Sequence, residues 1–475
     1  MFPEKNTRIH WERFIVRFAS YGLFVVSVTE KQPPALKRSI GLWSAVAINV
    51  GAIIGGGIFV VTGIAAGYAG SAMILSMLFA GVIAFLTGLS FAKLTAWQPV
   101  EGGAYEYGRQ LISPSVGFLA GWMWLVANTF TGAAVSLGFA AYLSSAVPGV
   151  PTNIVAAIIC LVFTGLNLIG AKQSASVNNI FVAVKLLILA FFVIFGAFSV
   201  DLGNFAPFTP ISSGVLYATF FIFFAYGGFA RVSVVAEEIK DAKRNVPRAL
   251  LLSLGISMLV YVLVGLVAVG LLGAPGLAAS SSPLSSAIMI TGNSLSVQLV
   301  AAGGLVATAS VLLTAILGVS RMAYSMARRQ DLPSSLAKLH SRFHVPSYSI
   351  LGTGILMAAL VLFVDLTQVV AISTFALVFT YVITNIAAYK LKNGSNRWRI
   401  LPLSALATCI MLLVFLLFAS SQAWIIGAAF LAAGVVYYAV LRRWRRQKRV
   451  LAHDVNKPST EPDVGLTDAH KSHPV

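Results

Sequence analysis

The chain has 475 residues, of which 58% are hydrophobic and only 10% are charged, and its formal net charge is +18. This composition excludes a soluble globular domain and is typical of an all-α protein that crosses a membrane many times. Basic loops on one side of a bilayer account for the positive charge, so we predict no nucleic-acid partner. Cys160 and Cys409 both fall in apolar segments, and we expect no disulfide between them.

Residues 1–40 are polar and basic, except for a short apolar stretch from Phe14 to Val28 that contains Arg17. That stretch is too short for a membrane span. A signal-like segment without a clear cleavage site, an interfacial helix and an extension from a misassigned start all fit it. We predict a cytoplasmic N-terminal segment that does not cross the membrane.

Twelve apolar segments follow, and together they predict one transmembrane domain over residues 41–441. The third and eighth exceed the bilayer thickness and should tilt or project from it. The tail at 442–475 opens with the basic run RRWRRQKR, which favours anionic lipid, and then becomes polar and disordered. The segments lie near 41–66, 71–93, 116–146, 152–170, 178–199, 212–236, 249–272, 291–326, 347–364, 368–390, 401–420 and 422–441.

Lysine and arginine fall on only one side of this arrangement. The connections that follow the odd-numbered spans contain neither residue type, whereas the other connections and both ends of the chain are basic. Basic loops stay on the cytoplasmic side. The split therefore predicts a multi-pass protein of the cytoplasmic membrane with both termini inside.

The first span carries the stretch GAIIGGGIF from Gly51 to Phe59, with three consecutive glycines at 55–57. Each glycine costs a helix interior about 1 kcal/mol relative to alanine, so this triplet favours a break. Backbone freed at membrane depth is tolerated only where it lines a cavity or is buried in protein. The alternative is that the glycines allow close helix packing.

The sixth span repeats this feature in FFIFFAYGGFA, from Phe220 to Ala230. Two interrupted spans that lie five spans apart fit inverted repeats, in which the ends of half-helices bind the charged groups of a substrate. The predicted substrate-binding residues are Ile53, Ile54, Gly55, Gly56, Gly57, Ala225, Tyr226, Gly227, Gly228 and Phe229.

Four motifs stand out along the chain: GAIIGGGIFVVTG (51–63), EGGAYEYGR (101–109), FFAYGGFARVSVVAEEIKDAKRNVPRAL (223–250) and RMAYSMARRQDLP (321–333). Together they resemble the amino acid–polyamine–organocation superfamily of permeases. The resemblance covers about residues 36–441 and implies a leucine-transporter-type fold, with ten core helices in two inverted repeats and two further helices. It also implies amino acids or related amines as substrates. Ala230 departs from the acidic or polar residue of many members, which implies a small pocket wall.

Lys185 lies in the fifth predicted span with about two turns of apolar residues on either side. Ionisable residues at this depth are costly and tend to mark ion pathways. The position resembles that of proton-coupled family members in which a lysine replaces a sodium ion. The alternative is a structural lysine that clamps the broken backbone without titrating. The expected partners are the carbonyls near Gly51 and Ile54 and the hydroxyls of Thr308, Ser310 and Thr314.

Charged and aromatic residues near the sixth span are candidates for gates. Arg231 either helps to bind a substrate carboxylate or lines a vestibule and reaches toward the cytoplasmic headgroups, and Phe229 is a candidate outer gate. Glu237 and Glu238 either form inner-gate ion pairs with loop residues such as Arg109 or belong to a solvated run. That run includes Lys240, Lys243, Arg244 and Arg248.

Trp122, Trp124, Asn128 and Tyr226 either line the site or pack the core. We predict no metal, no cofactor and no enzyme activity. The expected function is proton-coupled symport that imports an amino acid, with protons and the lipid bilayer as the other partners. An exchanger, a polyamine carrier and a sensor of the same fold remain alternatives. The oligomeric state is left open.

Overall fold

The computed structural model describes residues 38–147, 149–391 and 399–455. These residues form helices, apart from turns and one isolated bridge between Ile40 and Ile239. The predicted N-terminal segment 1–40 lies almost entirely outside the described residues, as does the end of the predicted tail after residue 455. The predicted all-α class is confirmed.

Ten helical runs in the described part of the chain are long and apolar enough to cross a membrane, and Ser347–Leu360 is a shorter apolar helix. The run Leu42–Trp97 has 56 residues. At 1.5 Å per residue that is about 84 Å of helix, far more than one crossing of a ~30 Å hydrocarbon core. It bends back at Gly70, whose φ of +59° suits glycine. A polytopic protein is confirmed, and the count of twelve spans stays a prediction.

The long helices mostly follow the predicted apolar segments, but the last one continues well beyond residue 441. They are α3 (Met73–Trp97), α5 (Pro114–Ala146), α6 (Thr152–Ile169), α7 (Ala171–Ala197), α8 (Ser213–Tyr226), α10 (Ala242–Ala278), α12 (Ser294–Arg328), α13 (Ser347–Leu360), α14 (Leu366–Lys390), α15 (Ile400–Ala419) and α16 (Ser421–Val455). Shorter pieces are η2 (Gly70–Ala72), α4 (Ala104–Leu111), η3 (Leu202–Phe205), η5 (Ala236–Glu238), α11 (Pro283–Met289) and η6 (Ser334–Ala337).

The first glycine stretch interrupts its helix. Helix α1 (Leu42–Ile53) ends at Ile54, whose φ of −77° and ψ of 102° are extended. The chain resumes as a π-helical turn, η1 (Gly57–Val61), and continues as α2 (Thr62–Ala69). A change to extended geometry removes the local i→i−4 hydrogen bonds, so several carbonyls of α1 need other partners.

The second glycine stretch tightens its helix and does not open it. Helix α8 passes into the 3₁₀ turn η4 (Gly227–Ala230), and α9 (Arg231–Val234) follows. Gly227 keeps a right-handed helical geometry, with φ −55° and ψ −18°. A 3₁₀ turn retains local hydrogen bonds, so it frees fewer backbone groups than an extended break.

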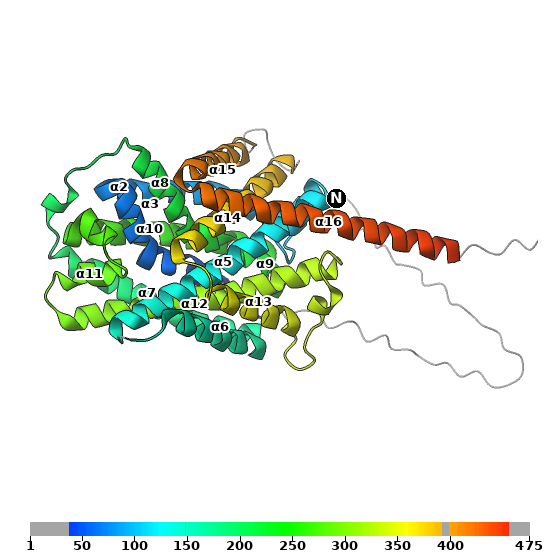
Figure 1. Cartoon of the computed structure of the whole chain (residues 1–475), viewed down its shortest axis with the longest axis horizontal. Helices are drawn as coiled ribbons and strands as arrows, with labels where there is room; N and C mark the ends of the chain where they lie inside the picture. Colours follow the sequence, from blue (N-terminus) through cyan, green and yellow to red (C-terminus); the bar gives the residue numbers. More distant parts are fainter. Residues whose placement is uncertain (1–37, 148, 392–398, 456–475) are drawn as a thin grey trace, which may run out of the picture. The chain divides into compact units, whose positions relative to one another are not determined.

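The interrupted helix α1 is enclosed by other helices. It packs against α7, α10 and α12, and it also contacts η4. Helix α5 runs beside α12 and α14, and α3 runs beside α8 and α10 (Figure 1). The backbone groups that α1 frees therefore face protein side chains and not lipid.

Candidate functional site

Lys185 lies in α7 and is fully buried. Its Nζ donates hydrogen bonds to the Gly51 carbonyl at 3.1 Å, to the Ser310 hydroxyl at 3.0 Å and to the Ile54 carbonyl. None of the ion pairs found among the described residues includes this lysine. One ammonium therefore links α7, the end of α1 and the middle of α12 through neutral acceptors alone. We refer to Lys185, Gly51, Ile54, Ser310 and Asn178 as the lysine cluster.

Asn178 fixes the geometry of this cluster. Its Oδ1 lies 2.8 Å from Ser310 Oγ, and its Nδ2 donates to the Ala47 carbonyl at 2.9 Å. A Cβ built on Gly51 would lie only 2.4 Å from Asn178 Oδ1. Glycine at position 51 is therefore what allows α1 to approach α7 closely enough for the lysine to reach its carbonyls.

Two of the hydroxyls that the sequence offered to Lys185 bond elsewhere. Thr308 donates to the Gly304 carbonyl at 2.8 Å in its own helix. Thr314 lies 3.1 Å from Arg231 Nη1 and accepts a hydrogen bond from it. The expectation that these threonines contact the lysine is corrected, because Thr308 bonds to the backbone of its own helix and Thr314 bonds to Arg231.

Two tyrosines donate hydrogen bonds to further backbone carbonyls around the interruption of α1. Tyr261 of α10 has its hydroxyl 2.6 Å from the Ile53 carbonyl and 3.1 Å from the Ala225 carbonyl. Tyr142 of α5 donates to the Phe59 carbonyl at 2.8 Å. The first of these lies between the α1 break and the end of α8, so it joins the two glycine stretches directly.

The glycines also allow close packing, which was the alternative explanation for their presence. A Cβ would lie 2.1 Å from a Val311 methyl at Gly55, 2.2 Å from the Ala225 Cβ at Gly57 and 2.2 Å from the Ala52 carbonyl oxygen at Gly228. Gly56 has more room, since its nearest neighbour would be a Val135 methyl at 3.0 Å. The first stretch therefore combines a real break with close helix contacts.

Aromatic residues of the sixth span are buried against neighbouring helices. Tyr226 packs edge-on against Tyr261 at 4.9 Å and donates to the Met77 carbonyl at 3.2 Å. Phe229 packs against Phe91 of α3 and Tyr381 of α14, with ring centroids 5.8 and 5.0 Å away. Phe91 lies near the end of α3 that leads to Glu101 and the charged residues described below. These contacts do not support Phe229 as an outer gate.

Arg231 follows η4 and is also buried, with 1% of its surface exposed. Its guanidinium donates to Thr314 of α12 and to Asn128 Oδ1 of α5, while Nε has no hydrogen-bond partner among the described atoms. Gly318 makes room for it, since a Cβ there would lie 3.2 Å from Arg231 Nε. The side chain therefore does not reach the headgroups, contrary to one of the two expectations.

The two candidate tryptophans of α5 face different neighbours. Trp124 lies beside Gly318, and its carbonyl accepts a hydrogen bond from Asn128 at 3.0 Å. Trp122 donates its indole N–H to the Phe430 carbonyl of α16 at 2.9 Å and stacks on Tyr437. Trp122 is therefore a packing residue between α5 and α16, and it does not face the lysine cluster.

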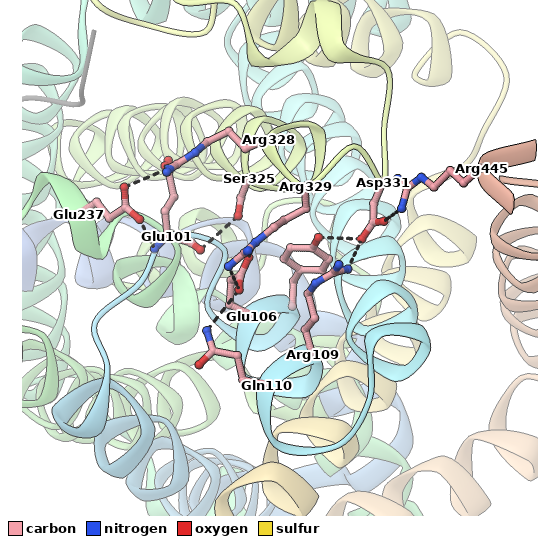
Figure 2. A network of polar contacts seen from close by, with 11 residues as sticks. Glu101, Glu106, Arg109, Gln110, Glu237, Ser325, Arg328, Arg329, Asp331 and Arg445 are labelled. Carbon is pink, nitrogen blue, oxygen red and sulfur yellow. Dashed lines mark hydrogen bonds and ion pairs between the residues drawn. The ribbon is translucent and has the colours of Figure 1, made fainter. Parts of the chain in front are cut away.

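Ten charged residues among those described form ion pairs at one end of the helix bundle, and we call them the ion-pair network; Figure 2 shows its members other than Glu238 and Arg321. Arg321 pairs with Glu238 at 2.7 Å in a fully buried setting, and Arg109 pairs with Asp331 at 2.7 Å. The members come from α4, η5, α12, α16 and the loops beside them. They are Glu101, Glu106, Arg109, Glu237, Glu238, Arg321, Arg328, Arg329, Asp331 and Arg445.

The predicted gate glutamates belong to this network, but with other partners than expected. Glu237 pairs with Arg328 at 3.2 Å, whereas Arg109 pairs with Asp331. The basic residues that follow Glu238 fit the alternative of a solvated run, because all four are exposed: Lys240, Lys243, Arg244 and Arg248. Sequence reasoning missed Glu101, Glu106, Arg321 and Asp331, although all four lie in the quoted motifs EGGAYEYGR and RMAYSMARRQDLP.

Glu101 is the least satisfied member of the network. Neither carboxylate oxygen has a hydrogen-bond partner among the described atoms, and the nearest cation is Arg328 Nη1 at 3.9 Å. Burial raises the pKa of this carboxyl well above its usual value, while Arg321 works against the shift. The carboxyl lies in the loop between α3 and α4, outside the membrane-spanning segments. It is therefore a buried group that holds its proton to higher pH than an exposed glutamate.

Comparison with known proteins agrees with this architecture. The family model described as amino acid permease matches residues 40–441. An uncharacterized transporter of Mycobacterium tuberculosis is 36% identical over 421 residues, which cover 88% of this chain and 94% of the relative. A methylthioribose transporter of Bacillus subtilis is 27% identical over 440 residues, which cover 87% of this chain and 95% of the relative.

A branched-chain amino acid permease of Bacillus subtilis is also similar, at 28% identity over 75% of this chain and 82% of the relative. The family match at residues 40–441 includes both glycine stretches and every member of the ion-pair network except Arg445. These matches confirm the resemblance to the amino acid–polyamine–organocation superfamily that the four motifs indicate. The chain therefore belongs to the amino acid permease family.

Proposed function

We propose that the protein transports amino acids across the cytoplasmic membrane together with protons. The observation that carries this proposal is the bonding of Lys185, a buried cation held by two carbonyls of α1 and one hydroxyl of α12. Its acceptors are those that would hold a metal cation. A lysine has the added property that it can lose its charge by releasing a proton, and burial disfavours the charged form of such a group.

In the proposed cycle the proton controls how firmly α1 is attached. The protonated lysine donates to both α1 and α12 and holds them together. The neutral amine loses a donor and its charge, so the Gly51 and Ile54 carbonyls are held less tightly and α1 can move relative to α12. Release of the proton to the inside would then accompany release of the substrate, as alternating access requires.

The substrate backbone is proposed to bind at the interruption of α1. The amides of Gly56 and Gly57 open the helical stretch η1–α2, where the first N–H groups have no partner in their own helix. The helix dipole adds positive potential there and favours a carboxylate. The end of α8 lies against this point, since a Cβ on Gly57 would touch Ala225. Both glycine stretches therefore border the proposed site.

The buried charges favour a substrate without a net positive charge. Lys185 and Arg231 are both buried near the interruptions, and neither is paired with a carboxylate among the described residues. A polyamine would place further positive charge beside them. Relatives named for branched-chain amino acids and for methylthioribose fit a neutral substrate, whereas others are named as cationic amino acid transporters, so the choice rests on the buried charges. We therefore propose neutral amino acids as the substrate class.

Uptake into proteoliposomes tests the proposal. The full-length protein would be offered labelled leucine, glutamate, arginine and putrescine under an imposed proton gradient, an imposed sodium gradient or none. We expect leucine to accumulate with the proton gradient only. Accumulation driven by sodium, exchange without net uptake, or binding without transport would each contradict proton-coupled symport.

Gly56→Leu tests the binding position in the same preparation. A larger side chain at this residue covers the amides at the start of η1, and Gly56 is the member of the triplet with the most room for it. We expect the variant to remain folded and to lose leucine binding. Unchanged leucine affinity in a monodisperse variant would rule out this site.

The proposed orientation places the ion-pair network and both termini in the cytoplasm. Asp201 and Lys338 are exposed and lie on opposite sides of the predicted topology. Single cysteines introduced at these positions, in a chain without Cys160 and Cys409, would be treated with a membrane-impermeant thiol reagent in intact cells. We expect labelling at position 201 only, and labelling at position 338 would reverse the orientation.

A further inference from the structure

A groove lies between the start of α5 and the second half of α16, on the side of the bundle that holds the ion-pair network. It has a volume of about 780 Å³. Three arginines line it, together with apolar and small residues of both helices. The lining residues are Pro114, Ser115, Leu119, Val435, Tyr438, Ala439, Arg442, Arg443 and Arg445, and we call this feature the arginine groove.

The charge in the groove is mostly uncompensated. Arg442 and Arg443 are exposed, and neither takes part in an ion pair with the described residues. The N-terminus of the 33-residue helix α5 opens at the same place, capped by Ser113. Its dipole adds to the positive potential. Guanidinium groups bind phosphate through paired hydrogen bonds, so the polar end of the groove suits a phosphate group.

The other end of the groove is apolar. Leu119, Val435 and the ring of Tyr438 line it, and Val435 is 49% exposed. Helix α16 is little covered by the rest of the protein, as expected of a helix that faces lipid. A phosphate site that continues into an apolar, lipid-facing wall matches an amphiphile better than a soluble anion.

We infer that the arginine groove binds the headgroup and first acyl segments of an anionic phospholipid. Arg442 and Arg443 would bind the phosphate, and Leu119 and Val435 would contact the chain. Arg445 is shared with the ion-pair network, because its Nη1 lies 3.2 Å from Asp331 Oδ1 (Figure 2). The bound lipid would therefore lie directly beside the Asp331–Arg109 pair. This inference concerns lipid binding and does not depend on the proposed transport function.

Lipid binding to the full-length protein in detergent, measured by native mass spectrometry, tests the inference. Phosphatidylglycerol and phosphatidylcholine with the same acyl chains would be compared. We expect preferential binding of phosphatidylglycerol, and a roughly thirtyfold loss of affinity in Arg442→Gln/Arg443→Gln, from two basic residues near a membrane surface. Equal binding of both lipids would overturn the inference.

Two further variants separate a defined site from general attraction. Lys338→Gln/Arg342→Gln removes the same charge from exposed residues of the same side, outside the groove. We expect it to change affinity less than twofold. Ala439→Trp fills the groove without altering charge, and we expect it to lose phosphatidylglycerol binding. Equal loss in the charge control, or full binding by Ala439→Trp, would contradict the site.

A competition experiment with a soluble anion distinguishes a lipid site from a site for free phosphate. Inorganic phosphate would be added at millimolar concentration in competition with phosphatidylglycerol. We expect no displacement, because the apolar wall contributes nothing to phosphate alone. Displacement of the lipid by inorganic phosphate at that concentration would show that the groove is a soluble-anion site, and would overturn the inference. Monodispersity of each variant on size exclusion is the folding control.

Discussion

The lysine cluster and the ion-pair network hold positive charge by opposite means. Lys185 is surrounded by carbonyls and a hydroxyl, whereas each arginine of the network lies next to a carboxylate. A proton can leave the lysine without stranding a negative charge in the protein. Separation of a buried arginine–carboxylate pair would strand both charges at a cost of several kcal/mol. The first arrangement can respond to protons, and the second responds to helix movement.

The difference matches the work proposed for each region. In the proposed cycle, Lys185 changes its protonation among neutral acceptors and so changes its hold on α1. At the end of the bundle, pairs such as Arg321–Glu238 join α12 to the segment that follows the sixth span. They can open only when the helices part, which is what an inner gate requires. The predictions below test this contrast, from the largest expected effect to the smallest.

Lys185→Ala should abolish accumulation driven by a proton gradient. The variant removes the ammonium that links α1 to α12, so the carbonyls of Gly51 and Ile54 lose this hydrogen-bond donor. Substrate binding can persist, because the proposed amides of η1 are unchanged. The measurement is labelled leucine uptake into proteoliposomes with an imposed proton gradient.

Lys390→Ala serves as the control for loss of a lysine, since Lys390 ends α14 and is exposed. It should accumulate leucine as the parent does. Full proton-driven accumulation by Lys185→Ala would exclude the lysine from coupling and would support the alternative of a structural clamp.

Glu238→Gln should lower the stability of the closed bundle by about 3–5 kcal/mol, because it leaves the buried Arg321 guanidinium without its partner. The expected result is a clearly lower thermal unfolding midpoint in detergent. Arg321→Gln in the same background should recover part of the loss, since the double variant has no stranded charge. Additive losses in the double variant would show that the two residues do not act as a pair.

Much of this architecture was predictable from sequence because the bilayer constrains it. Apolar runs must become helices in hydrocarbon, and a buried lysine must find acceptors, so contacts with Gly51, Ile54 and Ser310 were expected. The pairing within the network was not predictable in the same way. Glu238 and Arg321 are 83 residues apart, and only the packing of α12 against η5 decides which glutamate meets which arginine.

The two glycine stretches show a second feature that could not be predicted from the sequence. Both contain consecutive glycines, yet one opens at Ile54 and the other only tightens into η4. Consecutive glycines allow the backbone to leave α-helical geometry, and the neighbouring side chains determine how far it departs. Lys185 and Tyr261 supply donors to the carbonyls that α1 frees, and this compensation could not be read from the glycines themselves.

Glu101→Gln should change how stability depends on pH. Burial raises the pKa of the folded-state carboxyl, with opposing contributions from Arg321 and Arg328 and supporting ones from Glu238 and Glu237. The stability that comes from binding this proton is fully present below the pKa of Glu101 in the unfolded chain. It is lost as the pH rises through the higher pKa of Glu101 in the folded state. Glutamine cannot titrate, so the variant should gain stability relative to the parent as pH rises.

The measurement is the thermal unfolding midpoint of both proteins in detergent from pH 5 to pH 8. The midpoint of the variant minus that of the parent should increase with pH. Glu106→Gln is the matched control, because Glu106 is paired with Arg329 at 2.9 Å and lacks the unpaired oxygens of Glu101. A difference that stays constant across this range would mean that Glu101 does not carry a raised pKa.

Glu237→Gln should have the smallest effect, although it removes an ion pair of the same type as Glu238→Gln. Glu237 pairs with Arg328 at 3.2 Å, but the two side chains are 35% and 49% exposed. Water solvates whichever charge remains, so exposed pairs contribute about 0–1 kcal/mol. We expect the unfolding midpoint to move much less than in Glu238→Gln, and to become less sensitive to salt. Losses of equal size in the two variants would show that burial does not set the strength of these pairs, and that the network acts as one unit.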